Sequence, residues 1–131
     1  MTSLQPTDLT GQSILVVEDE YLIADEMVRT LKSFGVKVVG PAGSVDRAMA
    51  LIKEGGRLDG AVLDINLRGD MAYPIADMLM RREVPFLFTT GYDEDIVQDE
   101  YANVPRCEKP IEPGVLQTAL RRLLSKPTTI A

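Results

Sequence analysis

The sequence predicts an α/β fold in which helices cover both faces of a parallel five-stranded sheet. Two observations support this prediction. Short apolar runs rich in β-branched residues recur along the chain, and a stretch with helical periodicity follows each of them. The chain also has 131 residues, of which 45% are hydrophobic and 26% charged, and this suffices for one domain with its own core.

The expected strands are short and differ in pattern. The first, third and fourth are unbroken apolar runs, which are typical of strands buried on both faces of a sheet. The second alternates between apolar and polar residues and therefore indicates a position nearer an edge. In chain order, the five expected strands cover residues 14–17, 36–39, 60–63, 86–89 and 106–108.

The helices expected between these strands have recognisable ends. Apolar residues spaced four, four and three apart lead from Ile23 to Phe34, and Gly35 follows at the position of a C-cap glycine. Ser44 is suited to be the N-cap of the second helix. We expect the remaining helices over residues 71–83, over an acidic and poorly anchored stretch at 93–103, and over a strongly amphipathic stretch at 112–125.

A single domain accounts for most of the chain. Residues 13–125 contain all of the expected elements, residues 1–12 show no apolar periodicity, and residues 126–131 follow the last helix. We therefore interpret residues 1–12 as a flexible N-terminal tail and residues 126–131 as a C-terminal tail.

The composition excludes several classes of function. Without any histidine, the chain has no imidazole base for a Ser-His-Asp or Cys-His mechanism, and it cannot itself be the phosphohistidine carrier of a relay. One cysteine, Cys107, and no histidine also exclude the usual zinc sites. A formal net charge of −6 argues against nucleic acid as a partner.

The chain lacks the sequence features of an exported or membrane protein. No apolar run approaches the length of a membrane span, and residues 1–10 lack the apolar core of a signal peptide. A single cysteine is compatible with a reducing compartment. These features predict a cytoplasmic protein that does not bind membranes.

Polar side chains follow four of the expected strands at the points where the strands end. Glu18 and Asp19 follow the first strand, Asp64 the third, Thr90 the fourth and Lys109 the fifth. The carboxyl ends of parallel strands meet at one edge of a sheet. We therefore expect three carboxylates, a hydroxyl and an ammonium to converge on one crevice.

Carboxylates gathered in this way need compensating positive charge. Two like charges about 4 Å apart cost roughly 4 kcal/mol at an effective dielectric constant near 20. Lys109 supplies one positive charge, and Mg²⁺ suits the site because it binds one or two carboxylates, keeps waters and accepts a phosphate oxygen. Asp64 would then be the nucleophile that forms an aspartyl phosphate, while the metal, Lys109 and Thr90 contact the phosphoryl oxygens.

Four short motifs resemble those of the receiver domains of two-component response regulators. They lie at residues 14–20 (Ile-Leu-Val-Val-Glu-Asp-Glu), 62–64 (Val-Leu-Asp), 90–91 (Thr-Gly) and 109–110 (Lys-Pro). Each motif alone is weak, but all four in order on five expected strands are specific. The resemblance covers roughly residues 12–125, and it implies a flavodoxin-like, doubly wound (βα)5 sheet with the strand order 2-1-3-4-5.

The resemblance also implies a metal site and a phosphoacceptor. Glu18 and Asp19 match the acidic pair that holds Mg²⁺. Asp64 matches the phosphoacceptor and a further metal ligand, and the backbone carbonyl of Asn66 matches the position that completes the metal shell.

The same resemblance implies a pair of switch residues, and this chain departs from the family at one of them. Thr90 matches the switch hydroxyl, and Lys109 matches the family's lysine, whose peptide bond to the following proline is commonly cis. The aromatic switch residue expected three positions before that lysine is replaced by Arg106. Residues 88–92 (Phe-Thr-Thr-Gly-Tyr) resemble a subgroup with a Phe-Ala-Thr-Gly fourth strand, often found as lone receivers in alphaproteobacteria. We hypothesise that Tyr92 replaces the missing switch or screens the acyl phosphate from water.

These features predict a stand-alone receiver that takes a phosphoryl group on Asp64 from a sensor histidine kinase or a phosphotransfer protein. It would catalyse only its own phosphorylation and dephosphorylation. It would signal through phosphorylation-dependent protein contacts or act as a phosphate sink. A downstream target would use the face formed by residues 93–103, 106–108 and 112–125.

Two alternatives remain open. One is a Mg²⁺-dependent phosphohydrolase with an aspartyl nucleophile, although such enzymes usually carry a second acid two positions later, where this chain has Asn66. The other is a degenerate receiver used only for interaction, which the intact set of Asp19, Asp64 and Lys109 disfavours.

Overall fold

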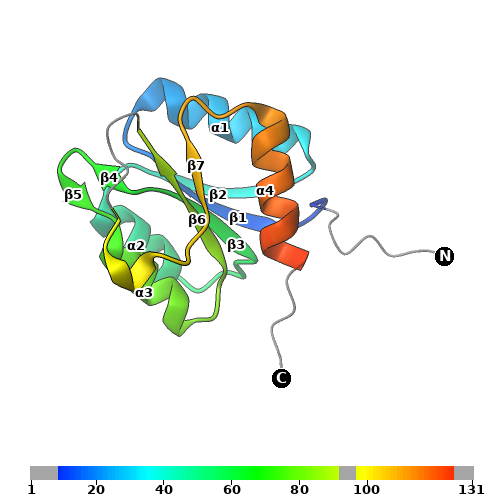
Figure 1. Cartoon of the computed structure of the whole chain (residues 1–131). Helices are drawn as coiled ribbons and strands as arrows, with labels where there is room; N and C mark the ends of the chain where they lie inside the picture. Colours follow the sequence, from blue (N-terminus) through cyan, green and yellow to red (C-terminus); the bar gives the residue numbers. More distant parts are fainter. Residues whose placement is uncertain (1–8, 92–96, 126–131) are drawn as a thin grey trace.

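A parallel five-stranded sheet forms the centre of the computed structural model, which describes residues 9–91 and 97–125. Its strands lie in the order β2-β1-β3-β6-β7 (Figure 1), which in chain order is 2-1-3-4-5. The predicted fold class and strand order are therefore confirmed. The strands are β1 (Ser13–Val17), β2 (Lys37–Ala42), β3 (Gly60–Asp64), β6 (Phe86–Thr90) and β7 (Arg106–Glu108).

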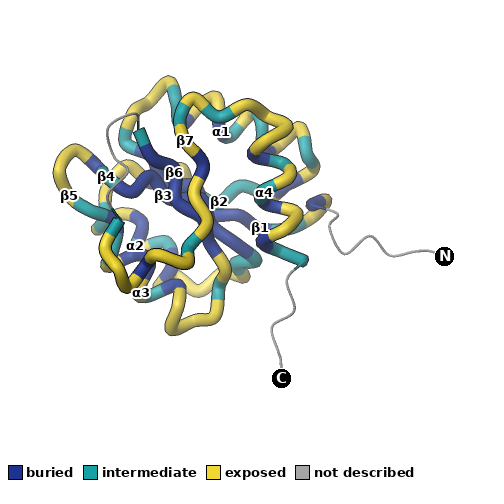
Figure 2. The backbone as a smooth tube through the Cα atoms, viewed as in Figure 1, coloured by how far each residue is buried: buried dark blue, intermediate teal, exposed yellow. Residues whose placement is uncertain are grey.

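Helices cover both faces of the sheet, α1 and α4 on one face and α2 and α3 on the other (Figure 1). Neighbouring residues of β1 show this two-sided burial, because Leu15 packs with residues of α2 and α3, whereas Ile14 packs with residues of α1 and α4. β1, β3 and β6 are buried along their whole length (Figure 2), as their unbroken apolar runs predict. The helices are α1 (Tyr21–Ser33), α2 (Val45–Lys53), α3 (Tyr73–Arg81) and α4 (Pro113–Ser125).

The register of the sheet brings the carboxyl ends of neighbouring strands together. Asp64, the last residue of β3, pairs with Thr89 of β6, and Thr90 pairs with Glu108 of β7. On the other side of β3, Glu18 directly follows β1. These strand ends therefore share one edge of the sheet, as parallel pairing requires.

The stretch expected to form a fourth helix differs from the prediction in its described part. Residues 97–103 hold one turn of 3-10 helix, η1 (Asp99–Tyr101), and no α-helix. Tyr101 is buried, but the acidic residues around it offer no apolar stripe that would hold a longer helix against the sheet. The described part of the chain thus has four α-helices, and none of them has the length and apolar character needed to cross a bilayer.

A short hairpin that the sequence analysis did not predict lies between β3 and α3. β4 (Asn66–Leu67) and β5 (Asp70–Met71) pair in antiparallel fashion across Arg68 and Gly69. These two residues have φ values of 56° and 96°, and a two-residue type I′ turn requires positive φ at both positions. Because the hairpin occupies residues 66–71, the third helix begins at Tyr73 instead of residue 71.

Residues 9–12, expected to belong to a loose tail, are attached to the fold. Leu9 is 3% exposed and packs in the same core cluster as α1 and α4. The backbone N of Gly11 donates a hydrogen bond of 2.8 Å to the carbonyl oxygen of Gly35. Leu9 is a single apolar residue among polar ones, so periodicity does not reveal its burial.

Candidate functional site

Three carboxylates gather at the carboxyl edge of the sheet. Glu18 and Asp19 follow β1, and Asp64 ends β3. Each offers an oxygen atom, and these atoms lie within 4.8 Å of one another. Glu18 and Asp64 are buried, whereas Asp19 is partly exposed. The structure thus brings together the three acidic residues that the sequence places at two strand ends.

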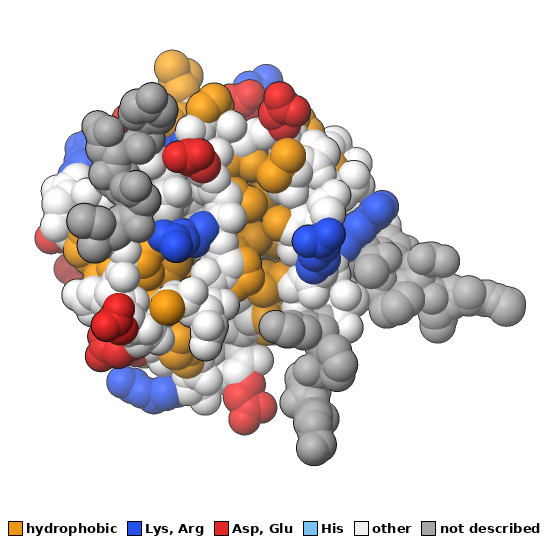
Figure 3. Space-filling view, viewed as in Figure 1, with side chains coloured by type: hydrophobic (Ala, Val, Ile, Leu, Met, Phe, Trp, Pro, Cys, Tyr) orange, Lys and Arg blue, Asp and Glu red, His pale blue; other side chains and the backbone are white. Residues whose placement is uncertain are grey.

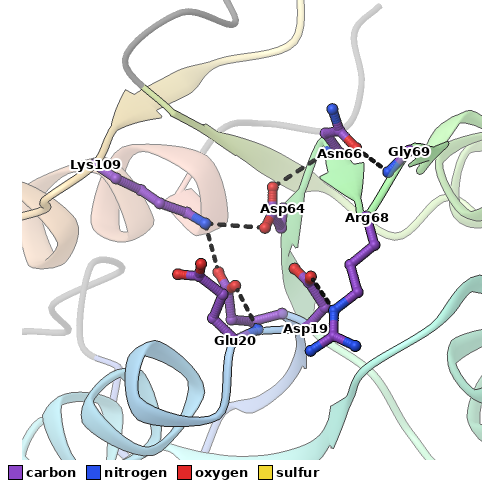
Figure 4. A network of polar contacts seen from close by, with 8 residues as sticks. Asp19, Glu20, Asp64, Asn66, Arg68, Gly69 and Lys109 are labelled. Atoms are coloured by element: carbon purple, nitrogen blue, oxygen red, sulfur yellow. Dashed lines mark hydrogen bonds and ion pairs between the residues drawn. The ribbon is translucent and has the colours of Figure 1, made fainter.

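Lys109 lies between two of these carboxylates (Figure 4). Its Nζ is 2.9 Å from Oδ2 of Asp64 and 2.8 Å from Oε1 of Glu18. Its backbone N donates a hydrogen bond of 2.8 Å to the carbonyl oxygen of Thr90, which holds the end of β7 against the end of β6. The peptide bond from Lys109 to Pro110 is cis. The ammonium is therefore fixed where it offsets part of the buried negative charge.

The pKa of Asp64 is raised to about 7, mainly by burial. The hydrogen bond from Lys109 acts to lower this pKa, and the charge of Glu18 acts to raise it. The backbone N of Asn66, which donates to Oδ1 of Asp64 at 3.1 Å, also acts to lower this pKa. Burial acts to lower the pKa of Lys109, but its contacts with Glu18 and Asp64 raise that pKa above the usual value. The lysine therefore stays charged at neutral pH, whereas ionised Asp64 calls for a further cation.

The donor atoms of the cluster fit a hard divalent cation. All three side chains offer oxygen, and their spacing allows them to share one ion. None of the three residues of the cluster offers the nitrogen or sulfur ligands that zinc prefers. Glu18, Asp19 and Asp64 therefore suit Mg²⁺ by their chemistry as well as by their spacing.

Arg68 is a contact of this cluster that the sequence analysis missed. Its Nε lies 3.1 Å from Oδ2 of Asp19 (Figure 4), although 49 positions separate the two residues. The side chain reaches Asp19 from the turn of the β4–β5 hairpin. In the sequence, only the position of Arg68 four residues after Asp64 could have indicated this contact. Because the hairpin is not predicted, that position is interpreted as part of an ordinary loop.

Two further predicted site residues lie at the same edge. Asn66 donates its backbone N–H to Asp64, which places this residue beside the carboxylates. Thr90 is 5% exposed and ends β6, the strand next to β3. The carbonyl of Asn66 as a metal ligand and the hydroxyl of Thr90 as a phosphoryl contact stay predictions.

Two other residues were predicted as candidates for a switch. Arg106 is exposed at the start of β7, where it pairs with Phe88, two positions before Thr90. Tyr92 lies outside the described residues. Their roles as switch residues stay predictions.

A buried tyrosine connects the segment after β6 to α3. The ring of Tyr101 stacks on Tyr73 with centroids 4.5 Å apart, and its hydroxyl donates a hydrogen bond of 2.6 Å to Oδ1 of Asp77. Phe88 of β6 meets the same ring edge-on. The sequence alone did not predict these contacts, because an aromatic residue in an acidic stretch does not reveal which helix it contacts.

Solved structures of known proteins include close matches to the whole fold. SdrG from Sphingomonas melonis Fr1 is 37% identical with a TM-score of 0.78, and the match covers 87% of this chain and 97% of that one. A structure of the BeF3-activated conformation of SdrG from Pseudomonas melonis Fr1 is also 37% identical, with a TM-score of 0.75 and coverage of 88% and 98%. The response regulator REC domain of PhyR from Erythrobacter litoralis is 23% identical with a TM-score of 0.78 and coverage of 92% and 98%, which shows the fold alone.

Curated relatives match over part of their own length. The sensory transduction protein LytT of Bacillus cereus is 34% identical over 88 residues, which are 65% of this chain and 35% of LytT. The phyllosphere-induced regulator PhyR of Methylorubrum extorquens is 28% identical over 114 residues, 85% of this chain and 43% of PhyR. The chain thus spans less than half the length of these curated relatives, and no protein-family model matches it. From the match to SdrG over nearly its full length, together with the fold, it follows that the chain belongs to the response regulator receiver domains.

Proposed function

We propose that this receiver accepts a phosphoryl group on Asp64 and releases it by hydrolysis. One observation carries the proposal. The buried Asp64 carboxylate contacts the Lys109 ammonium at 2.9 Å and also lies among oxygen ligands suited to a divalent cation. Phosphoryl transfer depends mainly on positioning and on compensation of charge. The site provides both without an additional catalytic base.

The residues divide this task among them. Glu18, Asp19, Asp64 and the carbonyl of Asn66 would hold Mg²⁺, which supplies positive charge to the phosphoryl group when it is bound. When the donor is a phosphohistidine, an oxygen of Asp64 forms the new bond to phosphorus as the bond from phosphorus to the histidine nitrogen breaks. The histidine nitrogen keeps the electron pair of the broken bond. Lys109 and the Thr90 hydroxyl would bind phosphoryl oxygens as negative charge redistributes among them.

The phosphoryl donor must lie outside these 131 residues, because they contain no histidine. A cavity of about 310 Å³ adjoins Lys109 between α1 and the loop from β7 to α4, and it is lined largely by apolar side chains such as Ile23, Ile111 and Leu116. Figure 3 shows hydrophobic side chains at the surface beside α4. We therefore propose a sensor histidine kinase or phosphotransfer protein whose helix packs against this cavity and presents phosphohistidine to Asp64.

Two further observations support a receiver over a phosphohydrolase. A relative at 37% identity has a BeF3-activated conformation, and trifluoroberyllate has the shape and charge of a phosphoryl group. In addition, the side-chain oxygen of Asn66 accepts a hydrogen bond of 2.6 Å from Gly69, and an amide cannot serve as a general acid. We infer that the chain turns over no external phosphate ester.

The proposed output is a change in protein contacts in the cytoplasm. A phosphoryl group adds about −1.5 to −2 charges at neutral pH, and the segment between β6 and β7 directly follows Thr90. The face formed by η1, β7 and α4 would then bind a downstream protein, or the receiver would drain phosphoryl groups from its kinase.

The test is the intact mass after incubation with acetyl phosphate and MgCl2. We expect wild type to gain one phosphoryl group and Asp64→Asn to gain none. Asp70→Asn, which removes an exposed carboxylate from the nearby hairpin, serves as the matched control and should behave as wild type. Phosphorylation of Asp64→Asn would contradict the proposal, and turnover of a chromogenic phosphate ester would favour the phosphohydrolase.

A further inference from the structure

Arg68 is held beside the carboxylate cluster by the backbone of the β4–β5 hairpin. Its φ of 56° lies in the left-handed region, which favours glycine, asparagine and aspartate over long side chains. The turn is supported by the antiparallel pairing of β4 with β5 and by the hydrogen bond from Gly69 to Asn66. Backbone preference therefore does not explain an arginine at this position, so its side chain is the feature that needs a role.

Each of the three carboxylates has its own set of contacts. Glu18 has both oxygens engaged, Oε1 with Lys109 and Oε2 with the backbone N of Glu20 at 3.0 Å. Asp64 likewise contacts Lys109 through Oδ2 and the backbone through Oδ1. Asp19 contributes Oδ2 to the guanidinium of Arg68. Each carboxylate of the cluster therefore has a resident cation.

The two resident cations differ in how easily they can leave. The side chain of Lys109 is 17% exposed and contacts two buried carboxylates, whereas the side chain of Arg68 is 78% exposed and contacts one. An arginine is charged at every accessible pH and repels a divalent cation that approaches the same carboxylate. A metal ion that binds Asp19 must therefore displace Arg68 or share its ligand with it.

The geometry points to Arg68 as a positioning residue that competes with Mg²⁺ for Asp19 and thereby weakens metal binding by the receiver. This inference rests on the proposed function, since it assigns Mg²⁺ to the three carboxylates. It adds a regulatory element built from this chain's own hairpin, namely a tethered cation that competes with the metal for Asp19.

The test is a titration of the full chain with MgCl2 alone. The NMR signals of the backbone amides at Glu18, Asp19 and Asp64 are recorded at each MgCl2 concentration to give the dissociation constant. Arg68→Asn is the main variant, because asparagine tolerates the left-handed turn and removes the charge. Losing an exposed ion pair should lower the Mg²⁺ dissociation constant by about two- to five-fold. Arg68→Lys keeps a cation on the turn and should bind Mg²⁺ more weakly than Arg68→Asn.

Arg57 provides a matched control. Its Nε lies 3.0 Å from Oδ1 of Asp59, and its side chain is also 78% exposed, but the pair precedes β3 at the opposite end of the strand from the carboxylates. Arg57→Asn removes the same charge and should leave the Mg²⁺ dissociation constant unchanged. The difference between Arg68→Asn and wild type should also shrink at about 0.5 M NaCl, where exposed charges are screened.

Three outcomes overturn the inference. They are unchanged or weaker Mg²⁺ binding by Arg68→Asn, an equal gain in Arg57→Asn, which would reflect net charge alone, and the absence of Mg²⁺ binding to both wild type and Arg68→Asn. The phosphorylation of Asp64 is tested separately by mass. An unaltered dissociation constant in a chain that still gains a phosphoryl group would therefore sink the role of Arg68 and leave the proposed function standing.

Discussion

Lys109 and Asp64 lie 45 positions apart in the chain, yet the Nζ of Lys109 is 2.9 Å from Oδ2 of Asp64. Asp64 ends β3 and Lys109 directly follows β7, and these strands are not neighbours, because β6 lies between them. Strands two places apart in a sheet are separated by about 10 Å. A lysine side chain is long enough to cross the end of the intervening strand, and the strand order thereby places the ammonium at the carboxylate.

Replacing Lys109 with glutamine should separate phosphoryl transfer from metal binding. The variant loses the cation that contacts Asp64 but keeps the three carboxylates, so Mg²⁺ should still bind. The rate of mass gain with acetyl phosphate should fall at least about ten-fold, because loss of a charge-stabilising contact costs more than 1.4 kcal/mol in the transition state. Lys37→Gln, on the exposed edge strand β2, removes the same charge and should react as wild type. An unchanged rate for Lys109→Gln would rule out the assigned role.

The raised pKa of Asp64 predicts that this residue destabilises the metal-free protein at neutral and higher pH. The pKa is about 7 in the folded chain and near 3.8 when the carboxyl is unperturbed. The folded state therefore keeps the proton between pH 4 and 7, where the unfolded state has lost it. The contribution of Asp64 to the free energy of unfolding is full below pH 4 and is lost as the pH rises through this window.

The variant Asp64→Asn cannot ionise and should escape this loss. In EDTA, its free energy of unfolding relative to wild type should increase by about 1–3 kcal/mol between pH 4 and pH 8. Urea unfolding at several pH values measures the difference, and contributions from groups common to both proteins cancel. Asp70→Asn, which replaces an exposed carboxylate of the hairpin, serves as the control for the substitution itself. A difference that does not vary with pH would mean that Asp64 titrates normally.

The strand ends of the site were predictable because one simple relation governs them. Unbroken apolar runs mark buried parallel strands, and polar residues at the carboxyl ends of such strands must meet at one edge. This relation alone locates Glu18, Asp64 and Lys109 on a common edge, and the structure adds the distances between them. The resemblance to receiver domains then supplies the strand order.

Contacts made by turns and by single side chains were not predictable. The hairpin that carries Arg68 depends on a left-handed conformation at a residue type that disfavours it. The burial of Leu9 depends on a single side chain, and the hydrogen bond from Tyr101 to Asp77 joins two segments with no shared periodicity. Periodicity reports faces of helices and strands, so it contains no information about such contacts.

Gly40 should not tolerate a side chain. A Cβ atom there would lie 2.9 Å from the carbonyl oxygen of Val16 and 3.0 Å from the backbone N of Ala42, and the φ of Gly40 is 101°. Gly40→Ala should therefore reduce the free energy of unfolding by about 2 kcal/mol or more. Gly56→Ala, where a Cβ meets no atom within 4 Å, should change it by less than about 1 kcal/mol. Urea unfolding of the two variants checks this, and equal stability would show that the backbone at Gly40 relaxes freely.

The hydroxyl of Tyr101 should stabilise the protein in a pH-dependent way. Its hydrogen bond to Asp77, together with burial, raises the pKa of Tyr101 to about 12 from an ordinary value near 10. The folded state therefore keeps the phenolic proton between pH 10 and 12, where the unfolded state loses it. The stabilisation is full below pH 10 and is lost as the pH rises toward 12.

Tyr101→Phe keeps the ring that stacks on Tyr73 and removes the hydroxyl alone. At pH 8 the variant should be less stable by about 1 kcal/mol, and its deficit should shrink as the pH rises above 10. Absorbance at 295 nm offers a second measurement, since the variant should lack the phenol whose ionisation is delayed toward pH 12. Tyr21→Phe, at a residue that is 82% exposed, should alter neither the stability nor that late ionisation. A phenol that still ionises near pH 12 in Tyr101→Phe would show that the raised pKa belongs to another tyrosine.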